Sequence, residues 1–167
     1  MGWNSGDGGG YSFKGTDRIL SCIPYLLPLL DGDAYGKYIY ARIPILGFLD
    51  NIVLGPFEAI FNGIPFLQLG VFFALVFGSR NADLFSRDVR FNMQQAILID
   101  ILLIFCGLVG QIAGFGAPRF LAEPANNFVF YTMIAMIGYS IYSNIVGKKP
   151  DQIPIVSEAA EMQLGPF

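Results

Sequence analysis

The chain has 167 residues, of which 54% are hydrophobic and only 14% are charged, whereas a typical soluble domain carries roughly 25% charged residues. Histidine is absent, which removes the commonest metal ligand and the commonest general base. No basic block is present that would bind nucleic acid. This composition predicts an all-α integral membrane protein with no catalytic site, no metal site and no nucleic acid partner.

The chain opens with a glycine-rich segment, residues 1–15, which we expect to be flexible. The first transmembrane helix is predicted over residues 16–38. Its apolar stretch, residues 19–30, would cover only about 18 Å of a hydrocarbon layer of roughly 30 Å, so the helix must extend on both sides. Pro24 and Pro28 are expected to kink it.

Apolar residues alternate with proline, glycine and acidic residues over residues 41–60. This pattern favours an interfacial helical segment, with Asp50 and Glu58 at the level of the lipid headgroups. The second transmembrane helix is predicted over residues 61–78, where the apolar run is again short.

Two longer apolar stretches follow, at residues 89–113 and 127–146, and each can cross a bilayer. The transmembrane domain, residues 16–147, is thus predicted to hold four transmembrane helices plus one interfacial segment between helices 1 and 2. Residues 148–167 form a polar C-terminal tail.

Basic residues are unevenly divided between the two faces that this topology creates. Seven of the ten lie in the N-terminal segment, the second loop and the tail, and three lie on the opposite face. The positive-inside rule therefore places both termini in the cytosol or in a compartment derived from it, which in a plastid is the stroma.

Five stretches carry a family resemblance: DRILSCIPYLLPLLDG, YGKYIY, IPFLQLGVFFALVFG, VRFNMQQAILIDILLI and PDQIPIVSEAAEMQ. They are similar to the twenty-kilodalton subunit family of the translocon at the inner chloroplast envelope, including its cyanobacterial and plastid-encoded relatives. The resemblance implies a four-helix, non-enzymatic core subunit for preprotein import in the plastid inner envelope, with both termini in the stroma. Its implied partners are other membrane subunits, translocating preproteins and lipids, and no cofactor is expected.

An alternative function stays open, that of a structural or pigment-associated accessory subunit of a photosynthetic complex in the thylakoid membrane. Chlorophyll or carotenoid would then be the cofactor. The absence of histidine disfavours this alternative, because chlorophyll would need another magnesium ligand. A small-solute carrier is a weaker third class.

Small and polar residues in the last two spans are candidates for helix contacts. Gly107, Gly110 and Gly114 would let another helix approach closely, and packing inside the chain's own bundle is favoured over an intermolecular contact. At least one of Gln94 and Gln95 must turn inward and needs a partner on another helix. The polar residues of the fourth span, including Tyr139 and Asn144, favour a buried polar seam over a water-lined face.

Asp100 stands in an apolar run about 15 Å along the helix from Arg90, close to the bilayer midplane. A carboxylate there costs about 2.5 to 3.5 kcal/mol on insertion scales, so Asp100 must face protein or water. Three roles are open, in decreasing order: an internal hydrogen bond to a group such as Tyr139, Ser140 or Asn144, a contact with a partner subunit, and a proton-relay or conduit-lining site.

The tail contains the stretch SEAAEMQ, which is predicted to form a short helix beginning near Ser157. We expect Ser157, Glu158 and Glu161 to dock on a stromal partner.

Overall fold

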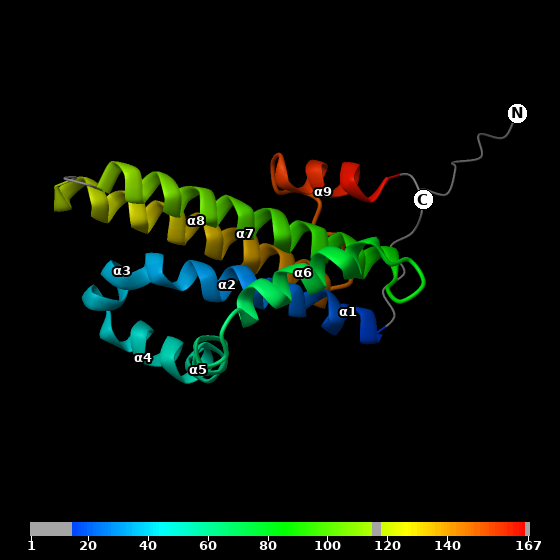
Figure 1. Cartoon of the computed structure of the whole chain (residues 1–167), viewed down its shortest axis with the longest axis horizontal. Coiled ribbons are helices and arrows are strands. Elements are labelled where there is room, and N and C mark those ends of the chain that lie inside the picture. The colour runs from blue at the N-terminus through cyan, green and yellow to red at the C-terminus, as the bar shows by residue number, and fades with distance from the viewer. Residues whose placement is uncertain (1–14, 115–117, 166–167) are drawn as a thin grey trace, which may run out of the picture.

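A computed structural model describes residues 15–114 and 118–165 of the chain. The predicted flexible N-terminus lies outside the described residues except for Gly15. Every described element is a helix, so the prediction of an all-α fold is confirmed. The longest helices run side by side along one axis (Figure 1).

The N-terminal part forms one helical rod whose segments follow one another along this axis (Figure 1). They are α1 Gly15–Cys22, η1 Ile23–Tyr25, α2 Leu26–Gly32, η2 Asp33–Gly36 and α3 Lys37–Arg42. The first 3-10 turn contains Pro24, whose missing N–H cannot continue the α-helical ladder. The rod includes 28 residues, about 42 Å at 1.5 Å per residue, and is therefore longer than the predicted span over residues 16–38.

The chain then returns through three shorter helices, α4 Pro44–Val53, α5 Gly55–Gly63 and α6 Leu67–Arg80. Proline stands in the first turn of α4 and of α5, where its fixed φ suits a helix start. α5 is seen end-on in Figure 1 and so runs across the axis of the long helices. Phe66, at φ 62°, separates α5 from α6, so the predicted span over 61–78 is not one helix.

Two long helices, α7 Arg87–Gly114 and α8 Arg119–Ile145, form the centre of the fold. They correspond to the predicted third and fourth spans, although α8 begins eight residues before residue 127. α8 ends at Ile145, and Gly147, with a φ of 77°, turns the chain just beyond it. There the N–H groups of Gly147 and Lys148 donate to the carbonyls of Asn144 and Ser143. α9 Val156–Leu164 then packs along α7.

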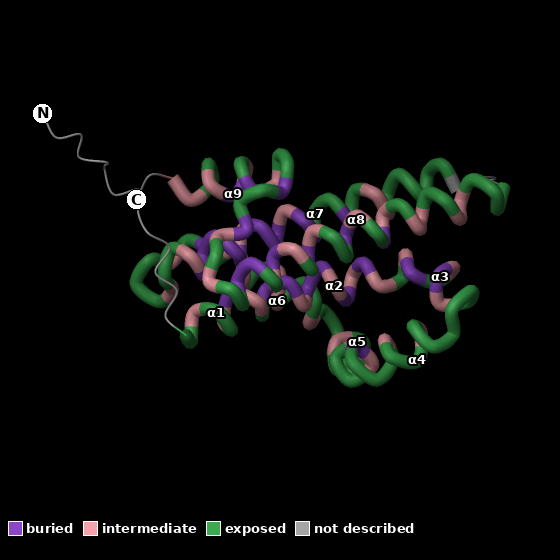
Figure 2. The backbone as a smooth tube through the Cα atoms, turned by 180° about the vertical axis from the view of Figure 1, so that it is seen from behind, coloured by how far each residue is buried: buried purple, intermediate pink, exposed green. Residues whose placement is uncertain are grey.

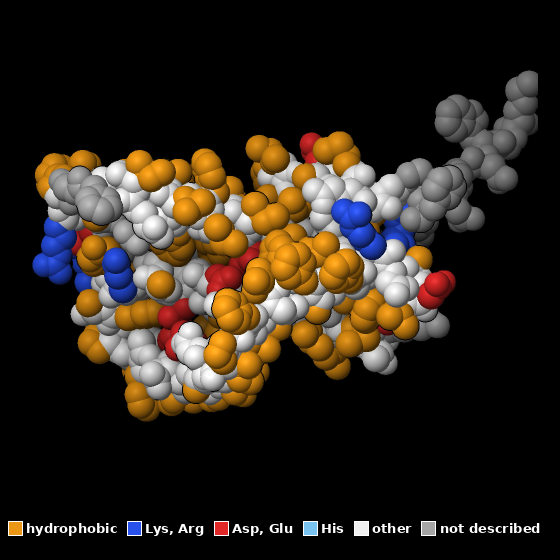
Figure 3. All heavy atoms as spheres, viewed as in Figure 1, with side chains coloured by type: hydrophobic (Ala, Val, Ile, Leu, Met, Phe, Trp, Pro, Cys, Tyr) orange, Lys and Arg blue, Asp and Glu red, His pale blue; other side chains and the backbone are white. Residues whose placement is uncertain are grey.

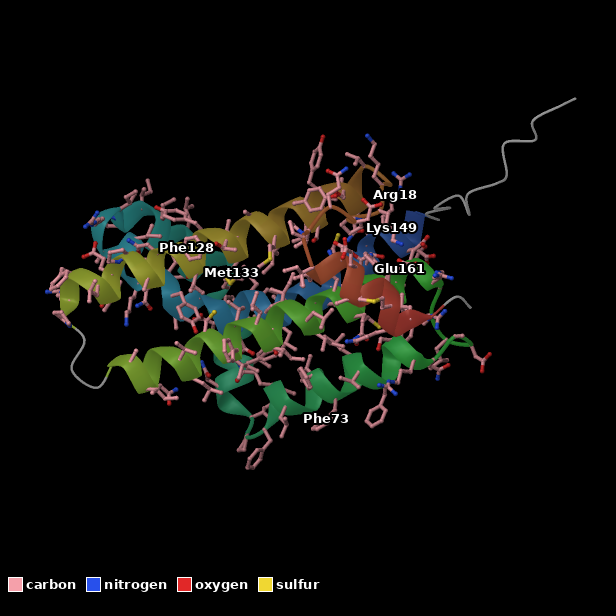
Figure 4. The ribbon with its side chains drawn as sticks, turned by 90° about the horizontal axis from the view of Figure 1, so that it is seen from above. Arg18, Phe73, Phe128, Met133, Lys149 and Glu161 are labelled. Atoms are coloured by element: carbon pink, nitrogen blue, oxygen red, sulfur yellow. The ribbon has the colours of Figure 1, made fainter. Side chains whose placement is uncertain are left out.

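Close approach of the rod to α8 depends on glycine. A Cβ on Gly32 would lie 1.8 Å from the sulfur of Met133, and a Cβ on Gly36 would lie 2.7 Å from the ring of Phe130. The backbone of α2 and η2 therefore lies directly against α8 side chains. Met133 points into this contact (Figure 4).

Buried residues concentrate in one half of the molecule, the half that holds α1, α6 and α9 (Figure 2). Their apolar members include Tyr25, Ile99 and Met133. In the other half, α7 and α8 expose large apolar side chains such as Ile112 and Phe128. The helices are thus held together near the end where the chain's described termini lie, and diverge from a packed core toward the opposite end.

Two of the described helices, α7 and α8, are long and apolar enough to cross a membrane, and α4 with α5 would make a third if this pair, bent by 58°, is one span. α6 is apolar but shorter. The chain is therefore an all-helical protein with two or three candidate membrane-spanning segments by this measure.

Candidate functional site

A buried network of polar side chains joins the rod to α7 and α8. The Tyr25 hydroxyl donates to Asn92 Oδ1 at 2.8 Å, and Asn144 Nδ2 donates to the same oxygen at 2.8 Å. One turn along α7, Gln95 Nε2 lies 3.1 Å from the Tyr25 hydroxyl and 3.0 Å from Ser140 Oγ. All five side chains are fully buried, so the network replaces water as the hydrogen-bonding partner of each.

The network extends to α9 through Ser157. Its hydroxyl lies 2.9 Å from Gln95 Oε1 and 3.0 Å from the carbonyl of Pro150, and it accepts the N–H of Ile153 at 3.1 Å. Ser157 is buried. The C-terminal helix therefore docks on the chain's own α7, because a buried glutamine on α7 offers the serine an acceptor. Docking of the tail on a stromal partner stays a prediction.

Glu161 strengthens the docking on α7 with charge. It pairs with Arg87 at 2.7 Å, and it also pairs with Lys149. Burial alone would raise the pKa of Glu161, but the hydrogen bonds and charges of Lys149 and Arg87 outweigh it and hold the pKa below its ordinary value. Figure 4 shows Lys149 and Glu161 close together at the α1 end of the molecule. Of the three predicted docking residues, only Glu158 is exposed.

Asp100 faces the rod. Among the described residues, no hydrogen bond joins it to α8, where we expected its first partner. Its carboxyl group and that of Asp31 on α2 line the same pocket and interact electrostatically, while Ser140 and Asn144 belong to the network one to two turns away. Asp100 is 1% exposed, and its Oδ1 has no hydrogen-bond partner among the described residues. Gln68, at the start of α6, donates to Asp31 Oδ1.

Two adjoining pockets share Asp31 and Ile104. The first, of about 210 Å³, is lined by Asp31, Gln68 and Asp100 together with the apolar Leu69, Phe72 and Ile104. The second, of about 320 Å³, continues along α7 past Tyr35 and Gly107 to Gln111. A mostly apolar recess with a few polar and acidic side chains thus leads from the middle of α7 toward the end of the molecule opposite α9.

The other predicted residues fall in different places. Gln94 accepts a hydrogen bond from Ser79 of α6 at 3.0 Å, so both adjacent glutamines find partners on other helices. The Tyr139 hydroxyl accepts the N–H of Gln152. Gly107 packs near Tyr35 of the same chain, a Cβ on Gly110 would meet nothing within 4 Å, and the surroundings of Gly114 lie outside the description.

The sequence patterns do not single out four residues of these sites: Tyr25 and Asn92 of the network, and Asp31 and Gln68 of the first pocket. Asn92 stands among the polar residues at the start of α7, yet it is fully buried. The signal for Asp31 is its distance from the nearest basic residue, because Asp31 lies about 20 Å along the rod from Arg18 and Asp100 about 15 Å along α7 from Arg90, which predicts similar depths for the two acids.

These sites define a class of protein, a helical membrane protein with a buried polar network that joins its helices. The described residues contain no group of His, Cys, Asp and Glu arranged to hold a metal ion. What the geometry provides is a fixed arrangement of helices at one end and an acidic recess at mid-length.

The chain belongs to the chloroplast import apparatus Tic20-like family, whose model matches residues 15–160. It is 34% identical over 155 residues to "Protein TIC 20-II, chloroplastic" of Arabidopsis thaliana, covering 89% of this chain and 73% of that protein. It is 33% identical to "Protein TIC 20-v, chloroplastic" of the same plant, covering 92% and 73%. It is also 30% identical to a "Tic20 family protein" of Synechocystis sp., covering 90% and 94%.

Proposed function

We propose that this chain is a non-enzymatic membrane subunit of the protein import translocon in the plastid inner envelope, where it forms a membrane core on which other subunits assemble. The observation that carries the proposal is the extent of the family match, which runs from the start of α1 into α9. The shared unit is therefore the whole arrangement of helices and not one motif. The photosynthetic alternative has no comparable support.

The distribution of packing supports a role in assembly. At one end the polar network ties α1, α7, α8 and α9 together, while large apolar side chains stay exposed on α6, α7 and α8, including Phe77, Ile112 and Phe128. Lipid tails or the helices of other subunits would cover these faces. A rigid end and uncovered apolar faces suit a subunit that organises neighbours.

We also propose four membrane crossings with both termini in the stroma. The rod α1 to α3, α7 and α8 would each cross, and the return from α3 would combine α4, α5 and α6 in place of an interfacial segment and a single helix. Basic residues support this orientation: Arg18 and Lys149 lie at the α9 end beside Glu161 (Figure 4), with which Arg87 also pairs, and the positive-inside rule turns the more basic face toward the stroma.

The orientation can be tested with single cysteines in a variant whose Cys22 and Cys106 are replaced by serine. An impermeant maleimide added to intact inner envelope vesicles of known sidedness should label Arg119→Cys from the intermembrane face and Asp151→Cys only from the stromal face. Labelling of Asp151→Cys from the intermembrane face would contradict the topology.

The function can be tested by the composition of the complex purified through a tag on this chain under mild detergent. We expect import subunits of the inner envelope. Recovery of photosystem subunits with chlorophyll or carotenoid, and of no import component, would instead establish the alternative.

A further inference from the structure

We propose that the recess between α2, α6 and α7 is a binding site for basic side chains of a polypeptide in transit, with the Asp31 and Asp100 carboxyl groups as the ligands. This inference rests on the proposed import function. Asp100 is 1% exposed and its Oδ1 lacks a partner among the described residues, yet it lines a pocket of about 210 Å³. A buried carboxyl oxygen that faces a pocket without a hydrogen-bond donor needs one from a ligand.

The chemistry of the pocket favours a guanidinium or ammonium group. Two neighbouring carboxyl groups that line one pocket in a membrane will not both stay ionised, so the pair carries at most one uncompensated negative charge, which a single cation would neutralise. The walls are Leu69, Phe72 and Ile104, and such walls suit the methylene stem of lysine or arginine.

An inorganic cation fits the same pocket poorly. The protein offers oxygens from Asp31, Asp100 and Gln68 only, fewer than the six to eight that calcium takes, and magnesium also demands near-octahedral geometry. The pocket is also much larger than a bare ion. A side chain fills both the polar end and the apolar remainder.

Further carboxyl groups stand on the approach from the end opposite α9. Asp33, Asp50 and Glu58 act on one another electrostatically, and Tyr40 donates to Asp33 at 2.6 Å. Among the described residues, none of these three acids, nor Asp31 or Asp100, forms an ion pair with lysine or arginine. Figure 3 shows acidic side chains gathered in the hollow between α6 and the helices α2 and α4.

Charge complementarity identifies the occupant as a segment rich in arginine and poor in acidic residues, which is the composition of organellar transit peptides. In the proposed orientation the hollow opens toward the intermembrane face. A preprotein arriving there would meet Asp33, Asp50 and Glu58 first and the Asp31 and Asp100 pair last. The gradient of carboxyl groups would draw its basic residues toward mid-membrane.

The test uses the full chain in nanodiscs of zwitterionic lipid and a synthetic amphipathic peptide of about twenty residues with four arginines and no acidic residue. Its binding is measured by fluorescence anisotropy at low and high salt. Asp31→Asn with Asp100→Asn should weaken binding about tenfold or more, because charge-assisted hydrogen bonds are lost. These two changes keep hydrogen-bonding groups in place, and thermal unfolding should confirm that the double variant folds like the parent.

The matched control is Asp83→Asn with Glu158→Gln, which removes the same number of carboxyl groups at exposed positions and should leave binding unchanged. Equal weakening of peptide binding by both double variants would show that only the net charge of the chain matters, and this result would overturn the proposal. So would equally tight binding of a peptide with glutamine in place of arginine.

A second measurement separates a side-chain site from an inorganic cation site. A hydrophobic carbodiimide should modify Asp100, and the basic peptide should protect it while sodium and potassium do not. Protection by either ion alone would overturn the proposal. If peptide binding failed although import subunits still co-purified, this inference would fall and the proposed function would stand. If the chain bound the peptide but purified only with photosystem subunits, the proposed function would fall, although the site would still bind basic side chains.

Discussion

Ser157 of α9 and Gln95 of α7 are joined by a buried hydrogen bond of 2.9 Å between the serine hydroxyl and Gln95 Oε1. The amide nitrogen of the same glutamine donates to Tyr25 and Ser140. One side chain on α7 therefore connects the rod, α8 and the C-terminal helix. The docking of the tail and the packing of the membrane helices depend on the same residue.

Replacing Ser157 by alanine should loosen α9 without disturbing the membrane helices. The change leaves Gln95 Oε1 buried without its donor, which costs about 1 to 3 kcal/mol. Hydrogen exchange of residues 156–164 should accelerate, while exchange in α7 and α8 stays slow. Glu158→Ala, at an exposed position on the same helix, is the control and should leave exchange unchanged. Equal exchange in both variants would show that the serine does not hold the tail.

Gln95→Leu and Tyr25→Phe should differ in their effects on stability. The leucine leaves the polar groups of Tyr25, Ser140 and Ser157 with fewer partners. The phenylalanine removes only the tyrosine hydroxyl, and the two groups bonded to it keep other partners, Gln95 with Ser140 and Asn92 with Asn144. Because hydrogen bonds between membrane helices average about 0.6 kcal/mol, we expect a loss of about 2 kcal/mol for Gln95→Leu and below 1 kcal/mol for Tyr25→Phe. Unfolding in mixed micelles measures both, and similar losses would contradict the central place of Gln95.

Gly32→Ala should be strongly unfavourable, and Gly110→Ala should be tolerated. The added methyl group at position 32 would overlap the sulfur of Met133, while at position 110 it would meet nothing within 4 Å. Overpacking of this kind costs about 1 to 3 kcal/mol. Melting temperatures of the two purified variants provide the comparison. A tolerated Gly32→Ala would mean that α2 and α8 are not in close contact.

Acidification should weaken the docking of the tail on α7, because Glu161 loses its charge. Its pKa is lowered in the folded protein, so the ion pairs stabilise docking above the ordinary pKa of glutamate, and this contribution is lost as the pH falls through the lowered value. Because the pairs are partly exposed, the effect should not exceed about 1 kcal/mol. Proteolysis near residue 150 by an acid-active protease should rise as the pH falls, and Glu161→Gln should remove the pH dependence. An unchanged dependence in that variant would assign it to another group.

Much of the fold could be predicted from local patterns. The apolar runs of α7 and α8 are long enough to indicate spans by themselves. An inward position for at least one of Gln94 and Gln95 follows from adjacent residues pointing about 100° apart on a helix. The return from α3 to α6 could not be predicted in the same way, because the break at Phe66 uses a left-handed backbone conformation at a residue type that rarely adopts it.

The sites were harder to predict because their residues come from distant parts of the chain. Asp100 could be identified as a buried acid from its place in an apolar run, but its neighbour Asp31 is brought to it by the packing of Gly32 on α8. The inward turn of Ser157 depends on an acceptor on α7 far away in sequence. The sequence around Ser157 shows no such acceptor within the tail itself, so the contact with α7 could not be predicted from this segment.

The most direct test of the import function is to arrest a tagged precursor during passage across the inner envelope and recover this chain after solubilisation. Our account predicts that the chain co-purifies with the arrested precursor, and that recovery falls when excess untagged precursor competes for import. Recovery at background level, while other inner envelope import subunits are retained with the precursor, would contradict the proposal that this chain belongs to the translocating complex.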